Sequence, residues 1–205
     1  MELTRAICVS FPRSGHHLLV RLLWDYFNGP GPVSTHPEPN RAFVYCSYYG
    51  HCHQVPCSLP ETNFQKHHDL DLSLATDLPC LVQVRSPLPA LRSYYQLFEE
   101  GRLPRLEAED WDTFARRGLA YHLAFCHKWL PRAGLVVSYE SMLADPEATL
   151  SRVIEWLGAG SVDQTRVRQA IAQERPRPLD RYSIGPGWQA EHIHWDQAYR
   201  QMLTR

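Results

Sequence analysis

Lys66, His67 and His68 place three nitrogen-bearing side chains side by side in the segment from Phe64 to Asp69. An ammonium group neutralises charge that develops on a leaving oxygen, and an imidazole, which titrates near neutral pH, accepts a proton from an attacking group. In an extended segment, positions 66 and 68 point to one side and position 67 to the other. We therefore expect Lys66 and His68 to act together in a group transfer, with His67 as the rival base. The structural alternative is a solvated polar loop.

The run Pro-Arg-Ser-Gly at residues 12–15 lies between an apolar run and an amphipathic stretch, residues 16–27. A strand that turns into a helix in this way gathers free backbone N–H groups and a positive helix end, which together bind phosphate or sulfate. Gly15 permits a close backbone approach, Ser14 adds a hydroxyl, and Arg13 adds a bidentate guanidinium. The alternative is an ordinary strand-to-helix turn. The G-x-x-x-x-G-K-[ST] loop of kinases and NTPases is absent.

Arg85 ends another apolar run, residues 81–84, and Ser93 follows eight positions later inside the next predicted helix. Short apolar runs alternate with helical patterns along the whole chain, which is typical of βαβ units and a parallel sheet. Together they predict strands at residues 6–10, 81–84 and 135–138, and helices at 16–27, 87–98, 111–130, 146–157 and 162–173, with a short final helix. We expect the irregular segments 29–62 and 175–188 to be loops over the carboxyl edge of the sheet, where α/β proteins bind ligands.

The composition sets limits on the class of protein. The 205 residues are 44% hydrophobic and 21% charged, as in an ordinary globular protein, and we expect one α/β domain over residues 1–205. A net charge of -1 argues against a dedicated nucleic-acid binder. No run approaches the roughly 18 apolar residues that cross a bilayer, and no signal peptide is evident, so we expect a cytoplasmic protein with reduced cysteines and no stable membrane insertion.

Four motifs in a fixed order resemble those of sulfotransferases that use 3′-phosphoadenosine 5′-phosphosulfate (PAPS). Ser-Phe-Pro-Arg-Ser-Gly-His-His-Leu-Leu at residues 10–19 is similar to that family's 5′-phosphosulfate loop, and Arg85 through Ser93-Tyr94-Tyr95 is similar to its 3′-phosphate motif. Residues 135–150, with the pair Tyr139-Glu140, resemble its third strand and the following helix start, and residues 181–188 resemble its C-terminal Arg-to-Trp loop. Lys66-x-His68 resembles its Lys-x-His element. The resemblance implies a P-loop NTPase-like sulfotransferase fold, with a central parallel sheet flanked by helices.

The same resemblance implies a role for each matching residue. Those that wrap the 5′-phosphosulfate are Arg13, Ser14, Gly15, His16 and His17. Arg85 and Ser93 hold the 3′-phosphate, Tyr139 touches the adenine, and Arg181 closes over the nucleotide. Lys66 and Arg13 act on the leaving oxygen, and His68 is the general base. PAPS is then the co-substrate, adenosine 3′,5′-bisphosphate is the product, and no metal is expected.

Several positions depart from the family's pattern. His16 and His17 stand where a Thr-Thr pair is usual, and Leu18 stands where many members have a tryptophan. In the C-terminal loop, Ser183 replaces a glycine, and Pro-Gly at 186–187 replaces Gly-Asp, so Arg181 is the least secure of the nucleotide residues.

The acceptor is not named by the sequence. A hydroxyl or amine of a small molecule or a carbohydrate fits the family. The residues expected either to line its pocket or to form an exposed strand and turn are Tyr45, Tyr48, Tyr49 and His51. Cys46, Cys52 and Cys57 lack the paired C-x₂-C spacing of common zinc sites, which leaves zinc, a disulfide and free thiols as alternatives. Alternative functions are a nucleotide-dependent small-molecule kinase and a non-catalytic nucleotide-binding protein with a degenerate site.

Overall fold

The computed structural model describes residues 3–33, 40–48, 52–100 and 110–174. Within them, five parallel strands form one sheet in the order β2-β3-β1-β4-β5. The strands are β1 (Ala6–Ser10), β2 (Tyr45–Ser47), β3 (Phe64–His67), β4 (Cys80–Val84) and β5 (Leu135–Ser138). The predicted α/β class with a central parallel sheet is therefore confirmed.

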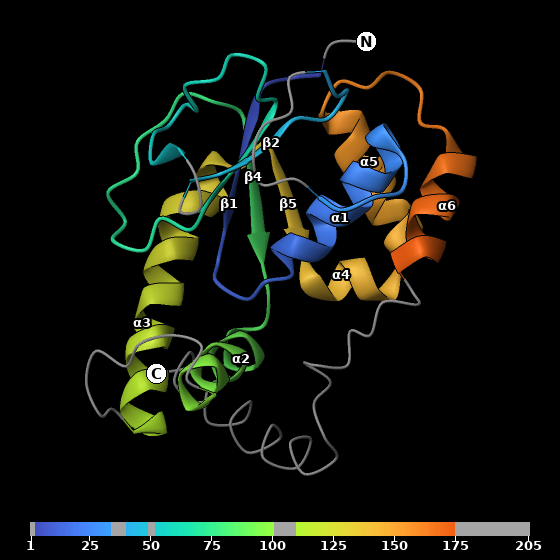
Figure 1. Cartoon of the computed structure of the whole chain (residues 1–205). Coiled ribbons are helices and arrows are strands. Elements are labelled where there is room, and N and C mark those ends of the chain that lie inside the picture. The colour runs from blue at the N-terminus through green and yellow to red at the C-terminus, as the bar shows by residue number, and fades with distance from the viewer. Residues whose placement is uncertain (1–2, 34–39, 49–51, 101–109, 175–205) are drawn as a thin grey trace.

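Helices cover both faces of this sheet (Figure 1). On one face pack α1 (His16–Asn28), α5 (Pro146–Trp156) and α6 (Gln164–Glu174), and on the other pack α2 (Pro87–Glu99) and α3 (Trp111–Trp129). A 3₁₀ turn, η2 (Leu130–Arg132), follows α3, and a short helix, α4 (Tyr139–Ala144), follows β5. Strand side chains alternate between the two cores, so that Cys8 lies in the α1 core and Val9 in the α2–α3 core.

The predicted strands and helices up to residue 174 are found with bounds that differ by two residues at most, whereas the predicted short final helix lies outside the described residues. The segment 29–62, expected to be irregular, contains the short strand β2, in the region where a strand and turn was one of the two alternatives. Three residues are too few to show a period, and β2 is defined by its pairing with β3 rather than by its own pattern. The helix α4 also escaped prediction, although the Ser138 side chain caps it by accepting a hydrogen bond from the Ser141 N–H.

The strand order brings the ends of three strands together. The chain runs from β1 to β2 and β3 on one side, then crosses β1 to reach β4 and β5 on the other. The carboxyl ends of β3, β1 and β4 therefore meet at one edge, where such sheets reverse their strand order and bind ligands. None of the described helices is long and apolar enough to span a membrane.

Candidate active site

The loop after β1 has a backbone shaped for an anion. Arg13 and Gly15 both have positive φ angles, 65° and 84°, and α1 begins immediately afterwards without a side-chain cap. Left-handed residues just before a helix turn successive N–H groups toward one point. Ser14 is buried, and its Oγ has no hydrogen-bond partner among the described residues. An unpaired buried hydroxyl is costly, and a polar ligand at this loop would supply the missing partner.

A tyrosine closes the back of this loop. A Cβ atom placed on Gly15 would lie 2.3 Å from Tyr139 Cδ2 and 3.0 Å from Met142 Cε, both in α4. No larger residue fits without moving the Tyr139 ring, so the sequence requires glycine here for space as well as for its φ angle. From the other side, Gln83 in β4 donates a hydrogen bond to the Ser14 carbonyl over 3.0 Å.

The residues predicted for the two phosphate sites form one connected group. Arg13 Nε donates to Ser93 Oγ over 3.0 Å, and Arg85 Nη1 donates to the Arg13 carbonyl over 3.3 Å. The Arg85 guanidinium also lies 4.4 Å from the centre of the Tyr139 ring, a cation–π contact. Partial burial lowers the pKa of Arg85, and the charge of Arg13 adds to this effect. Two cations are thus held close together at the carboxyl end of the sheet.

The two histidines at the start of α1 point in different directions. The His16 ring is buried, with Nδ1 3.3 Å from Cys8 Sγ and Nε2 3.3 Å from the Tyr45 hydroxyl. Burial and the nearby Lys66 lower its pKa well below the ordinary value, so the ring is neutral. The ring of His16 therefore belongs to the core, and its contribution to an anion would come from the backbone. His17 is exposed, and partial desolvation of its ring and then the charge of Lys66 lower its pKa.

Lys66 is buried beside the loop. In β3 it pairs with Cys8 of β1, and it is 8% exposed. No hydrogen bond or ion pair reaches its Nζ from the described part of the chain. Burial and, to a smaller extent, the charge of Arg13 lower the pKa of Lys66 to about 8. A buried ammonium without an anionic partner is costly, and an anion bound at the loop would supply that partner.

His68 is held by the end of the central strand. Its Nδ1 lies 2.7 Å from the Ser10 carbonyl oxygen and 3.1 Å from the Ser10 hydroxyl. A carbonyl only accepts, so Nδ1 carries the proton and Nε2 is left as the basic nitrogen. Burial and the charge of Lys66 lower the pKa of His68 to about 3. The ring is therefore neutral at physiological pH, which is the state a general base requires.

His67 lies on the opposite face of the sheet. Its Nδ1 accepts a hydrogen bond of 2.8 Å from the Asp69 N–H, and its ring centre lies 4.2 Å from that of Tyr48. It lines a separate cavity of about 420 Å³ together with Tyr48 and His53. This arrangement agrees with the alternation expected along an extended segment, because Lys66 and His68 turn toward the loop and His67 turns away.

Sequence reasoning missed the residues that position His68. Asp69 is fully buried; it accepts hydrogen bonds from Lys128 Nζ over 2.7 Å and from Trp129 Nε1 over 2.8 Å, both near the end of α3. The Tyr121 hydroxyl, also on α3, donates to the His68 carbonyl over 2.8 Å. The chain leaving β3 is thus fastened to α3 directly after the predicted base. An acidic residue next to the histidine pair was visible in the sequence, but nothing there linked it to Lys128.

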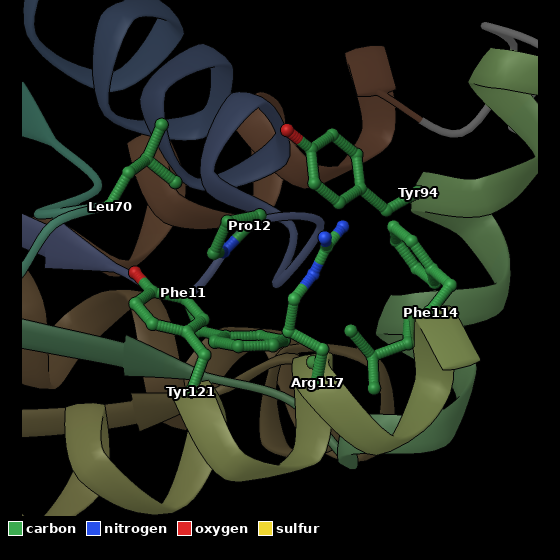
Figure 2. A pocket seen from close by; sticks show the side chains of 9 residues that line it. Phe11, Pro12, Leu70, Tyr94, Phe114, Arg117 and Tyr121 are labelled. Carbon is green, nitrogen blue, oxygen red and sulfur yellow. The ribbon is translucent and has the colours of Figure 1, made fainter. Parts of the chain in front are cut away.

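An aromatic cavity of about 230 Å³ opens beside the loop (Figure 2). Its lining is drawn from the loop, the segment after His68, α2 and α3: Phe11, Pro12, Leu70, Leu91, Tyr94, Phe114, Arg117, Gly118 and Tyr121. Figure 2 shows Arg117 rising from α3 so that its guanidinium lies between Pro12 and Tyr94. The cavity therefore combines apolar walls with one cationic group, next to the residues that hold His68.

The residues predicted to line an acceptor pocket do not gather there. Tyr45 is 2% exposed and belongs to the core beside His16, so its assignment to the pocket is wrong. Tyr48 lines the other cavity, with His67. Tyr49, His51 and Arg181 lie outside the described residues.

Comparison with known families gives a match to the second half of the sheet. Residues 80–163 match the model of the sulfotransferase family. This segment runs from the start of β4 to the residue before α6, and it includes Arg85, Ser93 and Tyr139. The match confirms the predicted resemblance to sulfotransferases for this part of the chain. The loop after β1 and the Lys66–His68 segment precede the matched residues and are not covered by the match. No curated protein matches the chain.

Replacing Asp69 with asparagine tests the anchor behind His68. Asp69→Asn leaves the Lys128 ammonium, 18% exposed, without its carboxylate, and breaking such a buried pair costs about 3–5 kcal/mol. We expect this loss in the free energy of unfolding measured by urea denaturation. The matched control is Asp71→Asn, an exposed carboxylate in the same loop, with a much smaller effect. Equal losses in the two variants would contradict the anchor.

The pH dependence of stability tests the environment of His68. Its pKa is about 3 in the folded protein against 6.5 ordinarily, so between these values the unfolded chain binds a proton that the folded chain does not. The free energy of unfolding therefore rises with pH through this window, by up to about 1.4 kcal/mol per pH unit for one ring. We expect His68→Asn to reduce that slope in urea denaturation between about pH 4 and about pH 6. An unchanged slope would show that His68 titrates alike in both states.

Proposed function

We propose, from the match of residues 80–163 to the sulfotransferase family and from the loop after β1, that this protein is a PAPS-dependent sulfotransferase. The observation that carries the proposal is the pair of buried polar groups beside this loop. Ser14 Oγ is buried without a hydrogen-bond partner among the described residues, and Lys66, 8% exposed, forms no ion pair within them. Ser14 lies in the loop whose backbone turns its N–H groups outward, between Arg13 and Gly15. One bound phosphosulfate satisfies both groups and the uncapped start of α1.

The nucleotide would occupy two neighbouring anion sites. The loop residues 13–17 bind the 5′-phosphosulfate through backbone N–H groups, the Ser14 hydroxyl and the Arg13 guanidinium. Arg85 and Ser93, at the adjacent end of β4 and in α2, bind the 3′-phosphate. Tyr139, which separates Gly15 from Arg85, is placed to contact the nucleoside between the two. Arg181 belongs to the proposal on the resemblance alone.

Different residues of the chain would remove the proton of the acceptor and neutralise the leaving oxygen. PAPS supplies the sulfuryl group and a good leaving group, adenosine 3′,5′-bisphosphate. His68 Nε2 takes the proton from the acceptor hydroxyl or amine as that group bonds to sulfur and the bond from sulfur to the 5′-phosphate oxygen breaks. Lys66 and Arg13 neutralise the charge that builds on this oxygen. Arginine, lysine and backbone donors are sufficient for this neutralisation.

Nucleotide binding and the strength of the base are linked. Burial is the main cause of the low pKa of His68, and the charge of Lys66 is the second. A phosphosulfate next to Lys66 offsets that second contribution, so the pKa of His68 rises toward the range of an effective base when the nucleotide is bound. The enzyme would thus acquire its base when it acquires the donor.

The cavity in Figure 2 is the proposed acceptor site. It adjoins the loop through Phe11 and Pro12, and Tyr121 joins it to the carbonyl of His68. Its walls favour an apolar or aromatic acceptor over a free sugar, because burying sugar hydroxyls requires more hydrogen-bond partners than these side chains provide. Arg117 would bind a negatively charged or polar end of such an acceptor.

Thermal stabilisation tests the nucleotide site. A ligand of the folded state raises its stability in proportion to ln(1 + [L]/Kd), so adenosine 3′,5′-bisphosphate should raise the melting temperature more than ATP with Mg²⁺. Arg85→Gln should weaken bisphosphate binding tenfold or more, because a hydrogen bond to a charged group contributes about 1.5–3 kcal/mol. The matched control, Arg92→Gln, alters an exposed arginine of α2 and should bind as the wild type does. A shift with ATP and Mg²⁺ alone would support a kinase instead.

Replacing each histidine in turn tests the assignment of the base. With PAPS and the best of a panel of phenols, alcohols and sugars, His68→Asn should lower the rate of transfer by about 10²–10⁴-fold while bisphosphate binding persists. Asparagine retains a donor for the Ser10 carbonyl, so the local structure is conserved. His67→Asn, on the other face of the sheet, should retain most activity. The reverse pattern would make His67 the base, and bisphosphate binding with no transfer by the wild type would indicate a degenerate site.

A further inference from the structure

Three cysteines converge at the edge of the sheet, away from the proposed transfer site. Cys46 lies in the edge strand β2, and Cys52 and Cys57 lie in the segment that leads to β3. Their three Sγ atoms all lie within 4.8 Å of one another, and those of Cys46 and Cys52 are 3.2 Å apart. Cys46 and Cys57 are buried, and Cys52 is half-buried. The fold therefore brings together three thiols for which the sequence left zinc, a disulfide and free thiols as alternatives.

The surroundings of these sulfur atoms supply hydrogen-bond donors. Thr62 Oγ1 lies 3.4 Å from Cys57 Sγ, and Gln65 Nε2 lies 3.3 Å from Cys52 Sγ. The same Gln65 amide accepts a hydrogen bond of 2.9 Å from the Cys57 N–H and is itself 2% exposed, which fixes its orientation. Donors aimed at sulfur stabilise a thiolate over a thiol. Hydrogen bonds of this kind, from residues around a metal site, orient the metal ligands and adjust their basicity.

The charges of three thiolates in one place must be balanced. The three sulfur atoms lie within 4.8 Å of one another, so three thiolates at these positions would repel each other. A thiophilic divalent cation removes that repulsion and displaces the thiol protons.

The sulfur spacing suits zinc. Ligands about 2.3 Å from a tetrahedral zinc ion lie roughly 3.8 Å from each other, which falls between the 3.2 Å contact of Cys46 with Cys52 and the 4.8 Å limit of the whole group. A disulfide would join only two of the three sulfurs and leave the third, with its donors, unused. No fourth histidine, cysteine or carboxylate of the described residues joins the group, so water or another donor would complete the coordination.

We propose that Cys46, Cys52 and Cys57 form a zinc-binding site that fastens the edge strand β2 to the segment preceding β3. The bound ion would stabilise the β2–β3 edge of the sheet, because Gln65 of β3 contacts two of these cysteines. Gln65 directly precedes Lys66, so the ion would also stabilise the strand that carries this lysine. Arg5 donates a hydrogen bond to the Cys57 carbonyl and brings a positive charge near the three thiolates. The site is structural and does not depend on the proposed transfer activity.

Metal content and cobalt spectroscopy test this site in the full chain. After incubation with Zn²⁺ under reducing conditions and removal of loosely bound metal by gel filtration, we expect one zinc ion per wild-type chain by mass spectrometry of the metal. With Co²⁺ instead, we expect the thiolate-to-cobalt charge-transfer band in the near ultraviolet. Cys52→Ser, at the least buried of the three positions, should lose both signals, and the matched control Cys126→Ser, also half-buried, should keep them.

Three results would overturn the proposal. One is a wild-type protein that retains no zinc and gives no charge-transfer band, a measurement that needs no variant to fold. Another is a Cys52→Ser protein that binds zinc as the wild type does. The third is a Cys46–Cys52 disulfide, found by peptide mass spectrometry, that forms equally fast with and without Zn²⁺, which would identify a redox pair instead.

Discussion

The parallel pairing of β1 with β3 is the constraint on which the rest of the site depends. The register sets Cys8 opposite Lys66, which turns Lys66 toward α1 and the loop and leaves His67 on the far face. One residue further along, His68 reaches the Ser10 carbonyl at the end of β1. A slip of one residue would exchange the two faces and move both Lys66 and His68 away from the loop. Backbone hydrogen bonds thus decide which side chains meet the loop.

The unpaired polar groups of the candidate site lower the stability of the free protein, and a bound polyanion would offset this loss. Lys66 is buried without a carboxylate, Arg13 and Arg85 lie close together, and Ser14 has an unpaired hydroxyl among the described residues. Each feature disfavours the free protein and favours a bound polyanion. The compensation comes from the buried pair of Asp69 and Lys128 behind His68, and from two apolar cores on either face of the sheet. A chain with almost no net charge can therefore hold a strongly cationic pocket.

The sequence was sufficient to predict the features that depend on local pattern. Apolar runs identified β1, β4 and β5, the Pro-Arg-Ser-Gly run identified the turn from β1 into α1, and alternation placed His68 rather than His67 on the side of Lys66. What escaped prediction depends on contacts between distant parts of the chain. The strand β2 is defined by its pairing with β3, and Asp69 contacts Lys128, which lies 59 positions further along the chain. The cavity is lined by residues of α2, α3 and the loop. The three cysteines are a further example. Their sequence spacing lacks the pattern of common zinc sites, and only the fold brings them together.

Tyr121 has two attachments that constrain how this protein can evolve. Its ring stacks on Phe11, with 5.6 Å between ring centres, and lines the cavity, while its hydroxyl holds the carbonyl of His68. The proposed acceptor cavity and the placement of the proposed base therefore depend on one side chain. Descendants that change the shape of the cavity at Tyr121 would also loosen His68, whereas changes at Tyr94 or Arg117 would leave it in place. Diversification toward new acceptors should accordingly proceed along the wall formed by α2 and the first half of α3.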